Sequence, residues 1–301
     1  MLGITVLGSG SAGNAVVITA PGARILVDVG LSARQMESRL RASGFDPDSF
    51  NAILLTHEHG DHVRGLDVFC RNRAIPVYCN RLTQRVVAEN LKSPLPWRLV
   101  EAGQTFQIQS LAVEAFSVPH DAVDPMGYTF AWQQAKVGVL TDLGHPTTLV
   151  IEKARGVHTL VLEANYDDVM LANDTKRPWP TKQRISARHG HLSNAQAAEL
   201  VAALIPHGLR RVVFSHLSRD CNSPDTVARA LGAHADLEII CSTQDTPTPH
   251  YAVPQPDIPV ECQPANNSPA PTIDDRCQES PAGESGFGAN PGKRVQAELF
   301  G

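Results

Sequence analysis

Short apolar runs separated by turns dominate the chain from its first residues to about residue 240. Runs of this kind predict buried strands. The expected strands are residues 4–7, 15–19, 24–29, 52–55, 111–117, 127–132, 137–140, 159–162 and 211–214. Pro21-Gly22 predicts a turn between the second and third runs. The runs at 127–132 and 137–140 are typical of a hairpin.

Helical spacing of apolar residues occurs in two segments, 33–43 and 194–204. Ser193 precedes the second segment and is a suitable N-cap, because its hydroxyl can accept a hydrogen bond from the first turn. Strands come first, then a helix, and the same order is repeated. This order predicts a layered α/β sandwich.

The composition changes near residue 245, beyond which Pro, Asn, Ser and Gly dominate. Such a segment cannot bury enough apolar surface to offset its ordering entropy. We therefore expect a folded domain over residues 1–252 and a disordered, Pro-rich tail over residues 253–301.

The formal net charge of the chain is -5, which argues against a generally sticky nucleic-acid binder. The tail from Val253 contains seven acidic and three basic residues, or -4, and the rest has 24 and 23, or -1. A nearly neutral domain leaves room for a local basic groove. No stretch approaches the roughly 20 apolar residues of a membrane span. The start lacks the features of a signal peptide, so we expect a cytoplasmic protein.

The six cysteines are scattered without a C-x-x-C pair, so we expect reduced thiols that do not bind metal. Residues 8–13 match the dinucleotide fingerprint G-x-G-x-x-G. That fingerprint requires a helix N-terminus after the loop to hold the pyrophosphate. A strand is expected at 15–19 instead, so a nicotinamide cofactor is not expected.

A cluster of metal-ligand types follows the expected strand at 52–55. It reads His57-x-His59-x-Asp61-His62, with three imidazoles and a carboxylate within six residues. A lone histidine is more often a surface or core residue, but four donors at this spacing favour a metal site. Imidazole with carboxylate suits Zn²⁺ or Mn²⁺.

One loop cannot surround an ion, so further donors must come from elsewhere in the chain. His120, Asp142 and His216 each lie just beyond an apolar run, where the edge of a sheet presents functional groups. Each alone would be interpreted as a residue that caps a strand end. Together with the histidine-rich loop, they are predicted to be ligands.

The complete set resembles the ordered motifs of the dinuclear metallo-β-lactamase superfamily over residues 1–245. The resemblance implies an αββα four-layer sandwich as the catalytic domain, 1–252, and two divalent ions, Zn or Mn. It implies that Asp142 bridges the ions and that Asp28 orients the ligand loop without touching metal. The other ligands it implies are His57, His59 and His120 for one ion, and Asp61, His62 and His216 for the other.

Four segments, residues 9–14, 119–122, 190–194 and 216–219, resemble the YycJ/WalJ subgroup of bacterial 5′-to-3′ exonucleases. Glu163 and His191 are similar to the Glu/His signature of RNase Z. No long insertion separates Asp142 from His216, so the β-CASP domain of RNase J-type enzymes is absent from the sequence.

The resemblance implies a phosphodiester hydrolase in which two ions activate the attacking water. His191 would protonate the departing ribose oxygen, and Glu163 would hold the tautomer of His191. Asp61 is included with these two residues in the predicted catalytic set. The alternative is that His191 caps the helix that begins near Asn194.

Residues 175–198 contain no acidic residue, but they include several basic residues and Trp179. Basic groups for phosphates beside an aromatic for bases suit single-stranded nucleic acid. The alternative is a solvated surface loop. The expected substrate contacts are Ser11, Asn14, Trp179, Arg184, Arg188 and Arg219.

The predicted function is a 5′-to-3′ exonuclease on single-stranded or end-exposed DNA, with a role in DNA repair. The alternatives are a phosphodiesterase for small cyclic phosphates and a non-catalytic metal-binding scaffold. A lactamase or thioesterase would explain neither Glu163 and His191 nor the basic stretch.

The end of the tail contains Gln296, Leu299 and Phe300. These residues resemble the Q-x-x-L-F peptide that binds the bacterial DNA sliding clamp. A clamp partner is therefore a second prediction, with a chance match as the alternative.

Overall fold

The structure, a computed structural model, describes residues 1–255. Two seven-stranded sheets face each other. The order of the first sheet is β14 (Tyr251–Ala252), β1 (Gly3–Gly8), β2 (Ala15–Ala20), β3 (Ala23–Val27), β4 (Ala52–Leu54), β5 (Val77–Cys79) and β6 (Trp97–Leu99). The order of the second is β13 (Glu238–Cys241), β12 (Arg211–Ser215), β11 (Thr159–Glu163), β10 (Ala135–Leu140), β9 (Met126–Trp132), β8 (Leu111–Ser117) and β7 (Thr105–Ile108).

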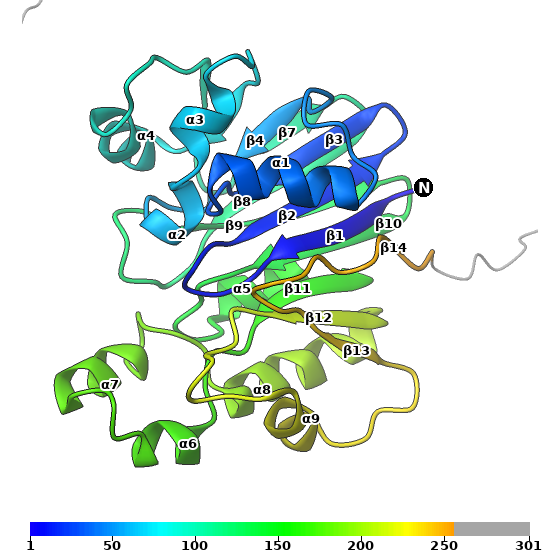
Figure 1. Cartoon of the computed structure of the whole chain (residues 1–301). Helices are drawn as coiled ribbons and strands as arrows, with labels where there is room; N and C mark the ends of the chain where they lie inside the picture. The colour runs from blue at the N-terminus through cyan, green and yellow to red at the C-terminus, as the bar shows by residue number, and fades with distance from the viewer. Residues whose placement is uncertain (256–301) are drawn as a thin grey trace, which may run out of the picture. The chain divides into compact units, whose positions relative to one another are not determined.

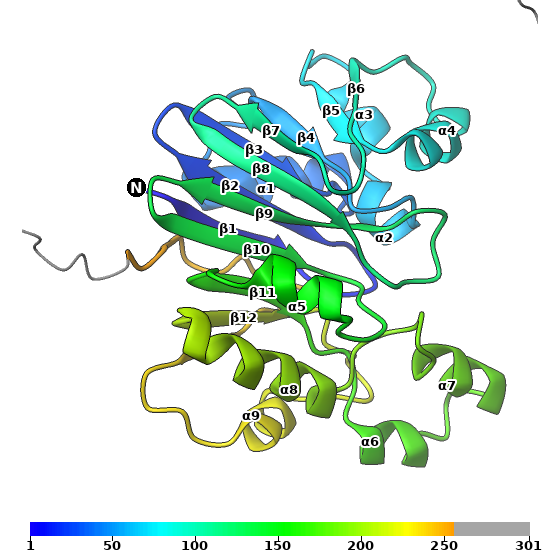
Figure 2. The ribbon, with the colours of Figure 1, turned by 180° about the vertical axis from the view of Figure 1, so that it is seen from behind.

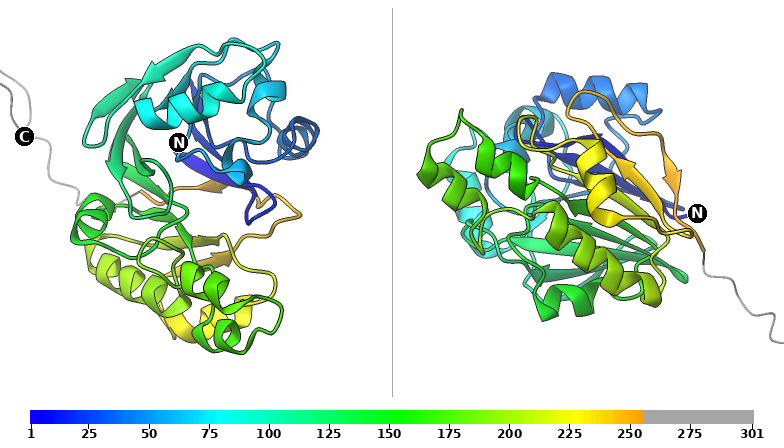
Figure 3. Two further views of the ribbon diagram at one scale, coloured as in Figure 1. Left: turned by 90° about the vertical axis from the view of Figure 1, so that its left-hand side faces the viewer. Right: turned by 90° about the horizontal axis from the view of Figure 1, so that it is seen from below.

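Helices cover the outer face of each sheet (Figures 1 and 3). The helices on the first sheet are α1 (Ala33–Ala42), α3 (Leu66–Cys70) and α4 (Arg81–Glu89), which share an apolar cluster with it. Those on the second are α5 (Thr148–Ala154), α8 (Asn194–Leu204) and α9 (Pro224–Leu231), seen from their own side in Figure 2. A third cluster fills the space between the sheets. The architecture is therefore the expected αββα sandwich.

The strands are apolar on both faces because both faces are covered. In β2, Val16 and Ile18 belong to the core between the sheets, whereas Ala15 and Val17 pack toward the helices on the outer face. Continuous apolar runs therefore mark the strands of this sequence, and all nine runs predicted as strands are strands.

The local predictions agree with the structure at several other points. Strands β9 and β10 pair antiparallel as the expected hairpin. Helix α8 spans the predicted residues and has a capping box formed by Ser193 and Gln196. The glycine-rich loop after β1 leads into β2 and not into a helix, which removes the basis for a dinucleotide site.

Three short helices lie around one end of the sandwich: α2 (Gly60–Val63), α6 (Asp168–Asn173) and α7 (Trp179–Ile185). None of the helices within residues 1–255 is long and apolar enough to cross a membrane. The predicted clamp-binding peptide at Gln296, Leu299 and Phe300 lies outside the described residues, as does the tail from residue 256 onward.

Candidate active site

Strands of both sheets end where the predicted site residues lie. Asp28 follows β3, and the loop from Thr56 to His62 follows β4. The second sheet supplies the remaining residues just beyond or at its strand ends: His120 after β8, Asp142 after β10, Glu163 at the end of β11, and His216 after β12. Ligand sites in α/β folds form at the carboxyl ends of strands in this way.

Three of these residues have a backbone conformation that L-amino acids rarely adopt. The φ angles of Asp28, Asp142 and His216 are 62°, 52° and 57°. A non-glycine residue in this left-handed region costs on the order of 1–3 kcal/mol and persists where surrounding structure enforces it. Each of the three turns the chain sharply after a strand, and the turn directs its side chain into the site.

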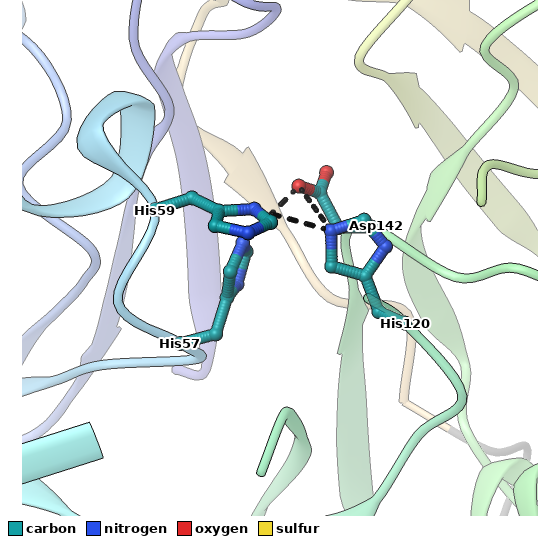
Figure 4. Close-up of side chains that lie close together, drawn as sticks. All are labelled: His57, His59, His120 and Asp142. Carbon is teal, nitrogen blue, oxygen red and sulfur yellow. Dashed lines mark hydrogen bonds and ion pairs between the residues drawn. The ribbon is translucent and has the colours of Figure 1, made fainter. Parts of the chain in front are cut away.

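One group of donors consists of His57, His59, His120 and Asp142, whose nearest donor atoms all lie within 4.8 Å of one another. Figure 4 shows His57 and His59 from one loop facing His120 and Asp142 from the opposite sheet. Oδ2 of Asp142 lies 3.3 Å from Nε2 of His57 and 3.5 Å from Nε2 of His120. Nδ1 of His59 lies 3.3 Å from Nε2 of His120.

A second group consists of Asp61, His62 and Asp142, again within 4.8 Å. Nε2 of His62 lies 3.1 Å from Oδ2 of Asp142 and 3.7 Å from Oδ2 of Asp61. Nε2 of His216 approaches the same Asp61 oxygen at 3.6 Å. A third group consists of Asp142, Glu163, His191 and His216, in which Nδ1 of His216 lies 2.5 Å from Oδ1 of Asp142. Asp142 belongs to all three groups, so its carboxylate lies among all the candidate ligands.

The side chains fit divalent ions. Nε2 of His57 and Nε2 of His216 are buried and have no hydrogen-bond partner within residues 1–255, although each faces a carboxylate. Burial lowers the pKa of His57 to about 4, with a further contribution from the charge of His62. A neutral imidazole is the form that binds metal. The donor groups contain only His, Asp and Glu, which suits Zn²⁺ or Mn²⁺.

Asp28 lies below this cluster and orients it. Its carboxylate accepts hydrogen bonds from the backbone N–H of Thr56 at 2.8 Å and from the Thr56 hydroxyl at 2.9 Å. Nδ1 of His62 lies 2.7 Å from Oδ2 of Asp28. With Nδ1–H donated to Asp28, Nε2 is the ring atom of His62 that faces Asp142.

Glu163 is completely buried and accepts hydrogen bonds at both oxygens. Oε2 accepts from the backbone N–H of Leu143 at 2.7 Å and of Leu192 at 3.2 Å. Oε1 accepts from Nδ1 of His191 at 2.7 Å and from Nδ1 of His216 at 2.9 Å. A carboxylate that already accepts four hydrogen bonds is suited to orient its neighbours and not to bind an ion.

Glu163 and His191 shift each other's pKa. Burial alone would raise the pKa of the Glu163 carboxyl, but the charge and hydrogen bond of His191 outweigh it and lower that pKa to about 2. Burial alone would lower the pKa of His191, but the Glu163 carboxylate raises it above the ordinary value. The helix that His191 precedes is capped by Ser193, so the interpretation of His191 as a helix cap is wrong.

An open cavity of about 340 Å³ lies over the candidate ligands and His191. Candidate ligands line it together with Ser11, Asp121, Arg184 and His191. Nε of Arg184, on α7, donates to Oδ2 of Asp121 at 2.6 Å. Asp121 was not among the predicted site residues, although its position next to His120 is a signal that the sequence contained.

The other predicted substrate contacts are distributed differently. Asn14 is only 3% exposed, and its amide lies 3.3 Å from Oδ2 of Asp61 and 3.0 Å from Nε2 of His62. It therefore contacts candidate ligands from behind. Trp179 is 66% exposed and lines a separate cavity of about 240 Å³. Arg188 contacts His145 and does not line the main cavity, and Arg219 lines a neighbouring one.

Comparison with known proteins identifies the family. Residues 23–217 match the model of the beta-lactamase superfamily domain. The chain belongs to the metallo-β-lactamase superfamily. An exodeoxyribonuclease YycJ of Bacillus anthracis is 34% identical over 224 residues, or 73% of this chain and 84% of the relative. An exodeoxyribonuclease WalJ of Streptococcus pneumoniae (serotype 2, strain D39) is 31% identical over 259 residues, or 81% and 96%.

Solved structures of this superfamily have the same fold. The metallo-β-lactamase-fold protein YhfI of Bacillus subtilis superposes with a TM-score of 0.65 at 13% identity, covering 82% of this chain and 99% of YhfI. With this family membership and the clustered His and Asp donors, the protein is a metal-dependent hydrolase of the YycJ/WalJ group.

Proposed function

We propose that this protein is an exodeoxyribonuclease that hydrolyses phosphodiesters of single-stranded or end-exposed DNA with two divalent ions, Zn²⁺ or Mn²⁺. The observation that carries the proposal is the Glu163–His191 pair, in which buried Glu163 holds His191 and His191 lines the open cavity beside the candidate ligands. A sugar oxygen is a poor leaving group, and a proton donor beside the metal site would assist its departure. The names of the two relatives support DNA as the substrate.

We assign the candidate ligands to two sets around Asp142. His57, His59 and His120 would hold one ion, and Asp61, His62 and His216 would hold the other, with Asp142 shared between them. Bound together, two ions supply an activated water and neutralise charge on the phosphate during an in-line displacement. Asp28 and Glu163 act through the imidazoles that they orient, so they are positioning residues.

His191 is the proposed general acid. Its Nδ1 is hydrogen-bonded to Glu163, so Nε2 remains for the substrate, and the side chain is 23% exposed where it lines the cavity. The raised pKa of His191 keeps the proton available for transfer. Donation to the departing deoxyribose oxygen prevents an unstable alkoxide from forming.

The surroundings of the cavity suit an anionic strand. Arg184 lines the wall, and Lys182 and Trp179 lie on the same short helix, α7. Trp179 and Lys182 line a separate cavity beside α7, where an exposed aromatic side chain and a basic group are of the kind that proteins use to bind single strands. The 5′-to-3′ direction rests on the resemblance to the YycJ/WalJ group, and the role in repair rests on the resemblance of Gln296, Leu299 and Phe300 to a clamp-binding peptide.

The test uses the purified full chain loaded with Zn²⁺ or Mn²⁺. Single-stranded DNA, RNA and a cyclic nucleotide are each offered, with the nucleic acids labelled at either end. The proposal expects mononucleotides to be released stepwise from the 5′ end of DNA, and chelation to abolish the release. Hydrolysis of the cyclic nucleotide without degradation of DNA would replace the proposal by a small-molecule phosphodiesterase.

A further inference from the structure

A second cavity, of about 300 Å³, adjoins the first, and Ser11 lines both. Its walls come from residues 10–12 and residues 217–220, with Arg177 and Gln244 completing them. His216 directly precedes the second of these segments, so the cavity begins one residue beyond a candidate ligand. Both segments belong to motifs that resemble the YycJ/WalJ group, yet metal binding requires only His216 among their residues.

The loop at residues 10–12 is fixed in place without its side chains. The amide oxygen of Gln244 accepts from the backbone N–H of Ala12 at 2.9 Å, and Arg64 donates to the Ala12 carbonyl at 2.8 Å. Gly10 has a φ of +128°, and a Cβ there would lie 2.7 Å from Oε1 of Gln244. Ser11 is exposed at the tip and makes no hydrogen bond to the rest of the described chain. A rigid loop therefore presents a free hydroxyl at the junction of the two cavities.

Two guanidinium groups line the second cavity, and they differ in how firmly they are held. Arg177 donates to Asp174 at 3.0 Å and to Asp220 at 3.1 Å, and its side chain is only 25% exposed. Arg219 donates to Asp245 at 2.8 Å through Nη2 alone, and these two side chains are 66% and 78% exposed. An exposed pair of this kind contributes little to stability, because solvent screens its charges. Arg219 can therefore exchange Asp245 for a phosphate at little cost.

We propose that the second cavity binds the nucleotide next to the scissile phosphate, with the neighbouring phosphate held by Arg219 and Ser11. A guanidinium group can make paired hydrogen bonds with phosphate oxygens. Arg219 lines the second cavity and can form such bonds once it leaves Asp245. This subsite makes the enzyme select a polynucleotide over a small diester, which fills the first cavity alone. The inference rests on the proposed function and specifies how its substrate is recognised.

The test compares two substitutions that break the same ion pair. Arg219→Gln removes the guanidinium group, whereas Asp245→Asn removes its partner and leaves it free. The quantity measured is the ratio of kcat/KM for a single-stranded oligodeoxynucleotide to kcat/KM for bis(p-nitrophenyl) phosphate. Arg219→Gln should lower this ratio by roughly 10-fold, as expected for a lost hydrogen bond to a charged group. Asp245→Asn should leave the ratio unchanged or raise it.

A second substitution and the salt dependence make the test independent of one variant. Ser11→Ala should also lower the ratio, because it removes the hydroxyl that contacts the phosphate. The fold should be unaffected, because no hydrogen bond inside residues 1–255 depends on this hydroxyl. Loss of one phosphate contact should also reduce the slope of log KM against log salt by about 1 for Arg219→Gln.

The outcomes separate the inference from the proposed function. Equal losses in Arg219→Gln and Asp245→Asn would mean that the ion pair is structural, and an unchanged ratio in Arg219→Gln and Ser11→Ala would mean that the cavity is not used. Either result overturns the subsite while DNA hydrolysis by the wild type stands. A wild-type protein that cleaves the small diester but not DNA would overturn the proposed function and the subsite with it.

Discussion

Replacement of His191 by alanine is the substitution that isolates proton transfer from metal binding. The imidazole contributes one hydrogen bond to Glu163, at 2.7 Å, and its side chain is already 23% exposed. After the substitution, Glu163 still accepts from the backbone of Leu143 and Leu192 and from His216. The candidate ligands therefore stay oriented, and the expected loss is that of a general acid, about 10²- to 10⁴-fold in kcat.

The assay pairs two substrates under single-turnover conditions, and elemental analysis is done on the same protein. DNA has a poor leaving group, whereas a p-nitrophenyl ester of a nucleotide has a good one that needs little protonation. His191→Ala should therefore lose much less activity on the p-nitrophenyl ester, with its metal content unchanged. His189→Ala is the matched control, because His189 is exposed and does not line the cavity. Equal losses on both substrates, or a loss of bound metal, would refute the role of His191 as the proton donor.

Three further predictions test other parts of the site. Asp142→Asn and Asp61→Ala should each abolish nearly all hydrolysis. Asp142→Asn should also lower the melting temperature of the metal-bound protein more than that of the metal-free protein, because a shared carboxylate separates two cations. Protonated His191 is the active form, so activity should fall as pH rises through its raised pKa. Glu163→Gln removes the carboxylate that raises this pKa, so it should move the alkaline limb of the kcat profile to lower pH. An unmoved limb would contradict the effect of Glu163 on His191. Trp179→Ala should weaken binding of single-stranded DNA by about 1–3 kcal/mol in a fluorescence titration, whereas Trp179→Phe should retain most of the affinity. An unaffected Trp179→Ala would mean that the exposed surface around α7 is solvated and does not bind the strand.

The strands could be predicted because of how this fold is covered. Both faces of most strands are buried, so each strand appears as a compact apolar run whose ends the pattern places within about two residues. Strands β5 and β6 have three residues each, and β6 lies at a sheet edge with Arg98 and Leu99 exposed. Strands of three residues carry too little periodicity to be distinguished from loops.

The candidate ligands could be predicted because local spacing places four of them on one loop. The contacts between distant segments could not. Asp121 and Arg184 are separated by 63 positions, and only the folded chain brings them to one cavity wall. Asn14 lies in a loop that the sequence presents as accessible, but it is buried behind Asp61. The fourfold role of Glu163 as an acceptor likewise depends on backbone groups that no side-chain pattern encodes.

The most direct test of a shared Asp142 carboxylate between two ions is a titration of the metal-free protein. Zn²⁺ or Mn²⁺ is added in small increments, and the rate of nucleotide release from single-stranded DNA is measured at each step beside the bound metal. The account predicts that activity rises until about two equivalents per chain are bound. Full activity at a single bound equivalent would contradict it.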